Sequence, residues 1–183
     1  MEKLYVCGYG AAGDKIDKIY FDECEKLGEG LASLGYGLVF GGGASGVMGA
    51  LVRGVKKANG SAVGIAPRFF DTPGTLYKGC DEFIFTDTMS QRKTLLEDRS
   101  AAFVICPGGI GTMDEFFETL TLRQLGVHNK PIVVLNINGC YDLLVEFLDG
   151  LVKKNFLGQS VFDNLKVAND TQDALAYLKQ VLG

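Results

Sequence analysis

The sequence predicts an α/β protein: a Rossmann-like, doubly wound parallel sheet of about seven strands with helices on both faces. Apolar strand-like runs alternate with helical patterns along the 183 residues, which is typical of βαβ units. The runs are apolar throughout, as expected of parallel strands that are covered on both faces. No linker, repeat or low-complexity tract interrupts this order, so we expect a single domain over residues 1–183.

The elements follow one another in a regular order. Strands are expected at residues 4–7, 37–40, 62–66, 82–85, 101–106, 131–135 and 165–168. Helices are expected at about residues 14–34, 46–59, 89–99, 113–126, 140–154 and 171–181. Gly35 and Gly37 end the first helix, as glycines commonly do past a helix C-terminus. Residues 67–78 have neither period, so we expect a loop that forms part of a pocket wall.

Three glycine-bearing segments follow predicted strands, at residues 8–13, 41–46 and 108–111. Right-handed crossovers bring the carboxyl ends of parallel strands to one edge of the sheet, so these segments are expected to gather there. Open α/β sheets bind ligands at that edge, at the point where the strand order reverses. The topology therefore predicts where a site lies before any motif is considered.

Composition and charge exclude several classes of protein. The net charge is −4 and the isoelectric point is about 5.0, which argues against a nucleic-acid partner. No apolar run approaches the length of a membrane span, and the first residues predict no signal peptide. The five cysteines lack C-x-x-C spacing, and the one histidine, His128, is expected on the surface. We therefore predict reduced thiols, no metal site and a cytoplasmic location.

The segment P-G-G-I-G-T-M-D-E at residues 107–115 carries the most specific signal. It links an apolar run to a helical pattern, so backbone N–H groups of its glycines can converge at a helix N-terminus and bind a phosphate. Thr112 adds a hydroxyl donor, and Glu115 lies one turn further on. These two residues also fit a capping box, in which the glutamate only returns to the cap amide. The glycines are Gly108, Gly109 and Gly111.

The two other glycine segments lack the residues of common nucleotide motifs. Residues 8–13 fit G-x-G-x-x-G, but the acidic residue that would hold the ribose of a dinucleotide is missing after the second strand. Residues 41–49 lack the lysine of a Walker loop. Ser45 suits the N-cap of the next helix, and the glycines around it either allow a tight turn or form a wall of a nucleotide pocket.

Together these segments resemble one known family. P-G-G-x-G-T-x-x-E is similar to the signature of the LOG-type phosphoribohydrolases, the "lonely guy" family of cytokinin-activating proteins. Residues 40–49 resemble the second glycine-rich loop of that family. The M-S-Q-R-K at residues 89–93 resembles its Met-His-x-Arg-Lys element, with Ser90 in place of histidine. The resemblance covers nearly the whole chain and implies a Rossmann-like fold, a homodimer and hydrolysis of nucleoside 5′-monophosphates.

The resemblance also assigns candidate residues. Glu115 is expected to be the catalytic carboxylate, in preference to the adjacent Asp114. Arg92 is expected to contact the phosphate, or to hold the leaving base and that carboxylate in place. As ordinary basic residues, Arg92 and Lys93 would instead belong to a solvated helix face. The candidate substrate-binding residues are Gly108, Gly109, Gly111, Thr112, Gly42, Gly43, Ser45, Met89, Lys93 and Gly8.

The expected activity is hydrolysis of the N-ribosidic bond of a purine nucleoside 5′-monophosphate, AMP or an N6-modified AMP, with no cofactor. The alternative is a non-catalytic carrier of a nucleotide or of molybdenum cofactor, since related proteins with similar P-G-G loops bind that cofactor. A carrier has no need of Glu115 and Arg92. A decarboxylase using pyridoxal phosphate would need a Schiff-base lysine with a pyridinium partner, a context that Lys93 lacks. The helix that carries Arg92 and the apolar helix after Thr112 are expected to supply the dimer interface.

Overall fold

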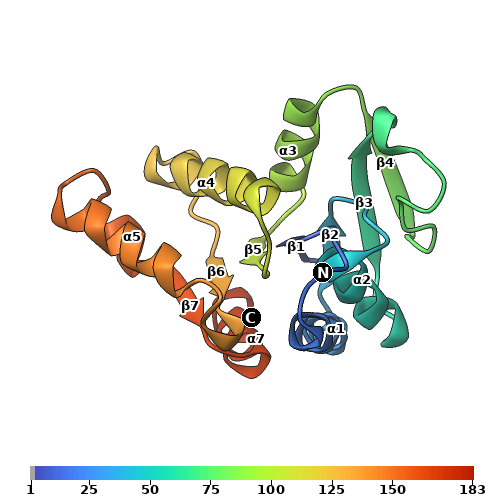
Figure 1. Cartoon of the computed structure of the whole chain (residues 1–183), viewed down its shortest axis with the longest axis horizontal. Coiled ribbons are helices and arrows are strands. Elements are labelled where there is room, and N and C mark those ends of the chain that lie inside the picture. The colour runs from blue at the N-terminus through green and yellow to red at the C-terminus, as the bar shows by residue number, and fades with distance from the viewer. Residues whose placement is uncertain (1–2) are drawn as a thin grey trace.

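A computed structural model describes residues 3–183 as a seven-stranded parallel sheet with helices on both faces (Figure 1). The strand order is β4-β3-β2-β1-β5-β6-β7, so the chain builds outward from β1, returns beside it at β5 and builds outward again. The predicted doubly wound fold is confirmed. The strands are β1 (Tyr5–Tyr9), β2 (Gly37–Phe40), β3 (Ala62–Pro67), β4 (Glu82–Thr86), β5 (Ala102–Ile105), β6 (Ile132–Leu135) and β7 (Leu165–Ala168).

The helices divide between the two faces of the sheet. On one face lie α1 (Lys18–Ser33), α2 (Gly46–Lys57) and α7 (Thr171–Leu182). The opposite face carries α3 (Met89–Asp98), α4 (Ile110–Gln124) and α5 (Asp142–Lys153), followed by the short α6 (Gln159–Asp163). Two single turns of 3-10 helix, η1 (Arg68–Phe70) and η2 (Ile137–Gly139), follow β3 and β6.

Each strand contributes to both cores because neighbouring side chains point to opposite faces. In β5, Phe103 packs in the core under α3, α4 and α5, and Val104 packs in the core under α1, α2 and α7. All four residues of β5 are buried. Full burial of a large apolar side chain such as that of Phe103 stabilises the folded state by about 1.5–3 kcal/mol. This burial on both faces explains why the strands are apolar without alternation.

Two helices begin at positions that differ from the prediction. α1 begins at Lys18 rather than near residue 14, because the preceding residues form a loop in which the Asp14 carboxylate accepts a hydrogen bond from the Gly46 N–H at 2.7 Å. α4 begins at Ile110 rather than at residue 113, with Gly109 as its N-cap. The start of α1 thus depends on a contact between loops that are distant in sequence. The short α6 was not predicted, since five residues show no helical period.

The three glycine-bearing loops meet at the carboxyl ends of β1 and β5, where the strand order reverses. The Ala11 N–H donates to the Pro107 carbonyl at 3.1 Å, which joins the β1–α1 loop to the β5–α4 loop. The Met48 N–H donates to the Ala11 carbonyl at 3.2 Å, which joins the first loop to the start of α2. The predicted gathering of the loops at this edge is confirmed. No helix within residues 3–183 is long and apolar enough to cross a membrane.

Candidate active site

A cavity of about 510 Å³ opens at this switch point between β1 and β5. Its lining comes from five parts of the chain: the β1–α1 loop, the β2–α2 region, the loop after β3, the start of α3 and the first turns of α4. Among the predicted site residues, Met89, Arg92, Gly109, Gly111, Thr112 and Glu115 line it. A cavity of this size suits a nucleotide-sized ligand.

The β5–α4 turn forms the glycine-rich end of the cavity. Gly109 caps α4 without any side-chain hydrogen bond, so the first N–H groups of the helix are available to an anion. Thr112 is buried beneath the turn, and a Cβ at Gly108 would collide with its hydroxyl. The absence of a side chain at Gly108 therefore lets the turn fold tightly over Thr112.

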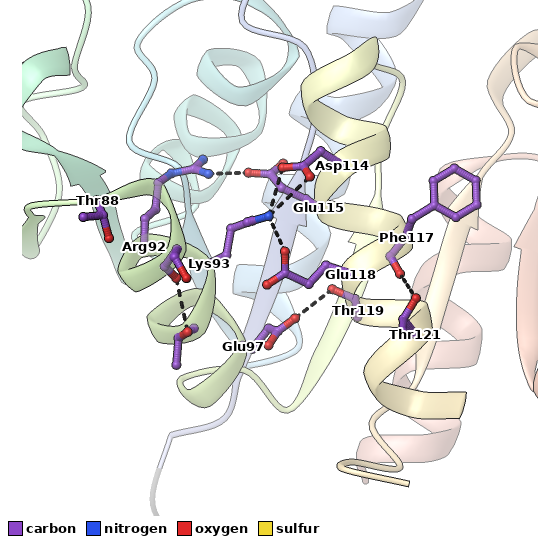
Figure 2. A network of polar contacts seen from close by, with 12 residues as sticks. Thr88, Arg92, Lys93, Glu97, Asp114, Glu115, Phe117, Glu118, Thr119 and Thr121 are labelled. Atoms are coloured by element: carbon purple, nitrogen blue, oxygen red, sulfur yellow. Dashed lines mark hydrogen bonds and ion pairs between the residues drawn. The ribbon is translucent and has the colours of Figure 1, made fainter. Parts of the chain in front are cut away.

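The capping-box interpretation of Thr112 and Glu115 is wrong. Because α4 begins at Ile110, Thr112 lies inside the helix and cannot be its N-cap. The Glu115 side chain does not return to a cap amide but points across to α3 (Figure 2). Its carboxylate is therefore committed to a tertiary contact.

That contact is a buried ion pair between α3 and α4. The Arg92 Nη1 atom donates to Glu115 Oε1 at 2.5 Å, and the two side chains are only 6% and 9% exposed. Arg92 Nε also donates to the Ile65 carbonyl at 3.3 Å, which fixes the guanidinium against β3. A Cβ at Gly41 would collide with the same guanidinium. Arg92 is thus not a residue of a solvated face, and the backbone around it is shaped to receive it.

The ionisation of Glu115 is governed by the burial of its side chain. Burial raises the pKa of the Glu115 carboxyl above its usual range, and the Arg92 guanidinium opposes this rise. A buried carboxylate beside a fixed cation can stabilise positive charge that develops on a ligand. Perturbed carboxyl groups in cavities are typical of catalytic sites.

Asp114 also lines the cavity, although we expected only one of the two adjacent carboxylates to face it. Its side chain is 55% exposed at the mouth and pairs with Lys93, with 3.1 Å between Lys93 Nζ and Asp114 Oδ2. Glu115 lies deeper, against Arg92. The two positions lie about 100° apart on the helix, so both line the cavity while Asp114 is exposed and Glu115 is buried.

Several predicted site residues lie outside the cavity lining. Gly8 lies within β1, where a Cβ would collide with Leu51 of α2, so it allows close packing of sheet and helix. The Ser45 hydroxyl donates to the Ala12 carbonyl at 3.0 Å; Ser45 is the N-cap of α2 by position, but its side chain does not cap the helix. Lys93 faces α4 instead of the cavity. The remaining predicted residues outside the lining are Gly42, Gly43 and Gly108.

The predicted loop at 67–78 does form a wall of the cavity. Phe70, Thr75 and Leu76 line it. Two backbone hydrogen bonds attach this loop to the second glycine loop: the Tyr77 N–H donates to Gly42 O at 2.8 Å, and the Ala44 N–H donates to Thr75 O at 2.9 Å. An isolated β-bridge between Gly43 and Leu76 adds to these bonds, so Gly42 and Gly43 hold this loop in place without lining the cavity.

Some lining residues were not predicted individually. Met48 adds to the apolar wall that Phe70, Leu76 and Met89 form. The first glycine loop contributes Gly10 to Gly13. The G-x-G-x-x-G spacing located that loop, but the apolar side chains carry no sequence signal that separates a ligand wall from ordinary core.

The cysteines and His128 are not among the residues that line this cavity. All five cysteines are free thiols, as predicted, and Cys7, Cys24 and Cys106 are buried. His128 is half-buried rather than on the surface: its ring lies against Phe103, and its Nδ1 accepts from the Lys130 N–H at 3.2 Å. Burial lowers the pKa of His128. Within the described residues 3–183, no group of three or more His, Cys, Asp or Glu side chains could hold a metal ion.

The fold and the cavity define a Rossmann-like protein with a small-molecule site at the switch point of its sheet. A family model described as "Possible lysine decarboxylase" matches residues 48–178. A cytokinin riboside 5′-monophosphate phosphoribohydrolase of Mycobacterium tuberculosis is 38% identical over 150 residues, which cover 82% of this chain and 80% of that relative. The chain belongs to this family, the LOG family of phosphoribohydrolases.

Two further comparisons agree with the fold and the family. A phosphoribohydrolase of the same name from Rhodococcoides fascians is 34% identical over 161 residues, covering 87% of this chain and 81% of that relative. The structure of the molybdenum cofactor carrier protein from Chlamydomonas reinhardtii superposes with a TM-score of 0.78 at 25% identity, with 99% of each chain covered. The resemblance identified from the three motifs is confirmed.

Proposed function

We propose that this protein hydrolyses the N-ribosidic bond of a purine nucleoside 5′-monophosphate, AMP or an N6-modified AMP, to the free base and ribose 5-phosphate. The observation that carries the proposal is the buried Arg92–Glu115 pair, which lines a cavity whose other end is the N-terminus of α4. The family relatives named phosphoribohydrolases support the same reaction.

The proposed reaction follows from the placement of charge. Cleavage of the bond between C1′ and the base nitrogen leaves positive charge on the sugar, and the Glu115 carboxylate stabilises that charge and orients the attacking water. The water oxygen bonds to C1′, and the elements of water are divided between ribose 5-phosphate and the free base. Arg92 holds Glu115 in place and supplies a cation near the departing base.

Binding of the phosphate is proposed to direct the sugar to Glu115. The first turn of α4, with Gly109, Gly111 and Thr112, receives the 5′-phosphate, and Glu115 lies one turn further along the same helix. Because both groups are on one rigid element, binding energy from the phosphate fixes the position of C1′ relative to the carboxylate. The apolar wall of Met48, Leu76 and Met89 remains for the base.

A nucleoside 5′-monophosphate is therefore expected to be cleaved at least about 10²-fold more efficiently than the matching nucleoside, because only the monophosphate gains the anchoring contacts. Comparing kcat/KM for AMP and adenosine, by chromatography of the released base, measures this difference. Equal turnover of the two substrates would contradict the phosphate role of the α4 turn.

The Gly108→Ala variant provides a structural test of the same prediction. Its added Cβ would collide with the Thr112 hydroxyl, so kcat/KM for AMP is expected to fall by about tenfold or more as the anchoring contacts are lost. The matched control is Gly150→Ala on α5, where a Cβ meets nothing within 4 Å and no loss is expected.

A homodimer is part of the proposal. Apolar side chains are exposed at both ends of α4, where Ile110 is 87% and Leu125 is 69% exposed. On α5, Leu143 is 80% and Phe147 is 54% exposed. Exposed apolar surface on this scale is commonly covered by a protein partner, and a second copy of the chain is the proposed one. We expect light scattering at micromolar concentration to give the mass of a dimer; the mass of a monomer would contradict this interface.

A carrier function is the second candidate, favoured by the superposition on the molybdenum cofactor carrier from Chlamydomonas reinhardtii. A carrier binds its ligand without turnover, so product formation from a monophosphate distinguishes the two. We place the hydrolytic reaction in the cytoplasm, and the five free thiols support that location.

A further inference from the structure

Lys93 holds α3 and α4 together beside the Arg92–Glu115 pair. Its Nζ atom lies 3.3 Å from Asp114 Oδ1 and also bonds Glu118, one turn further along α4 (Figure 2). The Lys93 side chain is only 16% exposed. We call Lys93, Asp114 and Glu118 the Lys93 cluster. Arg92 and Lys93 are thus neighbours on α3 with different surroundings: Arg92 lines the cavity, whereas Lys93 is outside the lining and pairs with carboxylates of α4.

Opposite charges pair across the interface between α3 and α4. Three carboxylates of α4 face two cations of α3. Arg92 pairs with Glu115, whereas Lys93 pairs with Asp114 and Glu118. Without Lys93, the charges of Asp114 and Glu118 would act on the buried Glu115 carboxylate with only Arg92 of α3 left to balance them.

We propose that Lys93 is a positioning residue for Glu115: it fixes the turn of α4 that carries this carboxylate and offsets the charge of Asp114 and Glu118. The proposal rests on the proposed role of Glu115 in hydrolysis. It replaces the direct substrate contact that the sequence motif suggested for Lys93, since Lys93 is absent from the cavity lining.

The sign of the effect follows from the groups that face Glu115. Burial raises the pKa of its carboxyl most, and Asp114 raises it further, whereas Arg92 and Lys93 from α3 lower it. Cys7 and Tyr9 of β1 also face Glu115, but burial raises the pKa of each, so both are uncharged at working pH. Hydrolysis needs ionised Glu115, so loss of Lys93 moves the acidic limb of activity to higher pH.

The first test is the pH profile of kcat for Lys93→Met. Its acidic limb is expected to shift to higher pH, with KM for AMP changed less than about twofold, because Lys93 does not touch the substrate. Lys93→Arg retains the charge and is expected to restore the wild-type limb. Lys153→Met, which breaks only the exposed pair with Asp149, serves as the matched control and should leave the profile unchanged.

A compensating variant guards against a merely structural effect. Lys93→Met combined with Glu118→Gln removes one charge of each sign, so the limb is expected to return toward the wild-type position. An unshifted limb in Lys93→Met, or a raised KM with an unshifted limb, overturns the proposal. A shift that persists unchanged in the combined variant also overturns it, because charge balance would then not be the cause.

A second readout does not depend on activity. Titration of the glutamate side-chain carboxyls by ¹³C NMR, with the Glu115 signal assigned from Glu115→Gln, reports the ionisation of this group in wild type and in Lys93→Met. The Glu115 midpoint is expected to move to higher pH in the variant, because a cation that lowers its pKa has been removed. A rise without any wild-type turnover would refute the proposed function but support the role of Lys93; an unchanged midpoint refutes the role itself.

Discussion

Replacement of Glu115 by glutamine is expected to lower turnover of a nucleoside 5′-monophosphate by on the order of 10²-fold or more. The amide retains the size of the side chain and can still accept the hydrogen bond from Arg92, but it lacks the negative charge that stabilises the sugar cation. Steady-state release of free base from AMP measures the loss, and circular dichroism checks that the fold is retained.

Controls separate this catalytic role from a local structural one. Glu146→Gln, on the exposed side of α5, changes the net charge by the same amount and is expected to retain full turnover. If Glu115 only stabilised its helix, Glu115→Gln would lower the melting temperature but leave turnover intact. That outcome would remove Glu115 from the mechanism.

Replacement of Arg92 by alanine is expected to abolish turnover and to lower the free energy of unfolding by about 3–5 kcal/mol at neutral pH. The variant leaves the Glu115 carboxylate buried without its cation. Turnover with AMP and denaturant unfolding measure the two effects, and the dimer mass should remain, because Arg92 lies in the cavity and not on the exposed apolar surface.

The free energy of unfolding of Arg92→Ala is expected to depend on pH in a defined direction. Burial raises the pKa of Glu115 in the folded state, and removal of Arg92 takes away the main opposing charge. The folded state then binds a proton more readily than the unfolded chain, so stability falls as pH rises from the usual glutamate pKa of about 4.3 through the raised folded value. The loss relative to wild type should therefore be smaller near pH 4 than at pH 7.

Two further variants sharpen the test of Arg92. The double change Arg92→Met and Glu115→Leu removes both buried charges, so it should recover much of the stability without recovering turnover. Arg99→Ala, at the end of the same helix, breaks only a partly exposed pair with Glu82 and should change either property little. An active Arg92→Ala protein would contradict the proposed site.

The fold could be predicted in most respects because its determinants are local. Parallel strands buried on both faces produce continuous apolar runs, and all seven predicted strands are present, with ends within two residues of the prediction. Gly35 takes a φ of +85° directly after α1, as a glycine past a helix C-terminus should. The start of α1 was misplaced because a loop contact, the bond from the Gly46 N–H to Asp14, holds the preceding residues out of the helix. α4 begins earlier than predicted, directly after its N-cap Gly109.

The candidate site was predictable where the backbone defines it and less so where side chains meet. Glycines after β5 located the α4 turn, and the family motif located Arg92 and Glu115. The pairing of Lys93 with Asp114 and Glu118 joins residues more than 20 positions apart, so no sequence period indicates it. Leu76 likewise reaches the cavity only because its loop is bonded to Gly42 and Ala44.

The central claim is that this chain cleaves the N-ribosidic bond of a nucleoside 5′-monophosphate. Incubation of the purified protein with AMP and with an N6-modified AMP, followed by chromatography of the products, tests it directly. The predicted result is equimolar free base and ribose 5-phosphate from at least one of the two, with release slower by on the order of 10²-fold or more in the Glu115→Gln protein. Unchanged monophosphates, bound but not cleaved by the wild-type protein, would contradict the claim and favour a carrier.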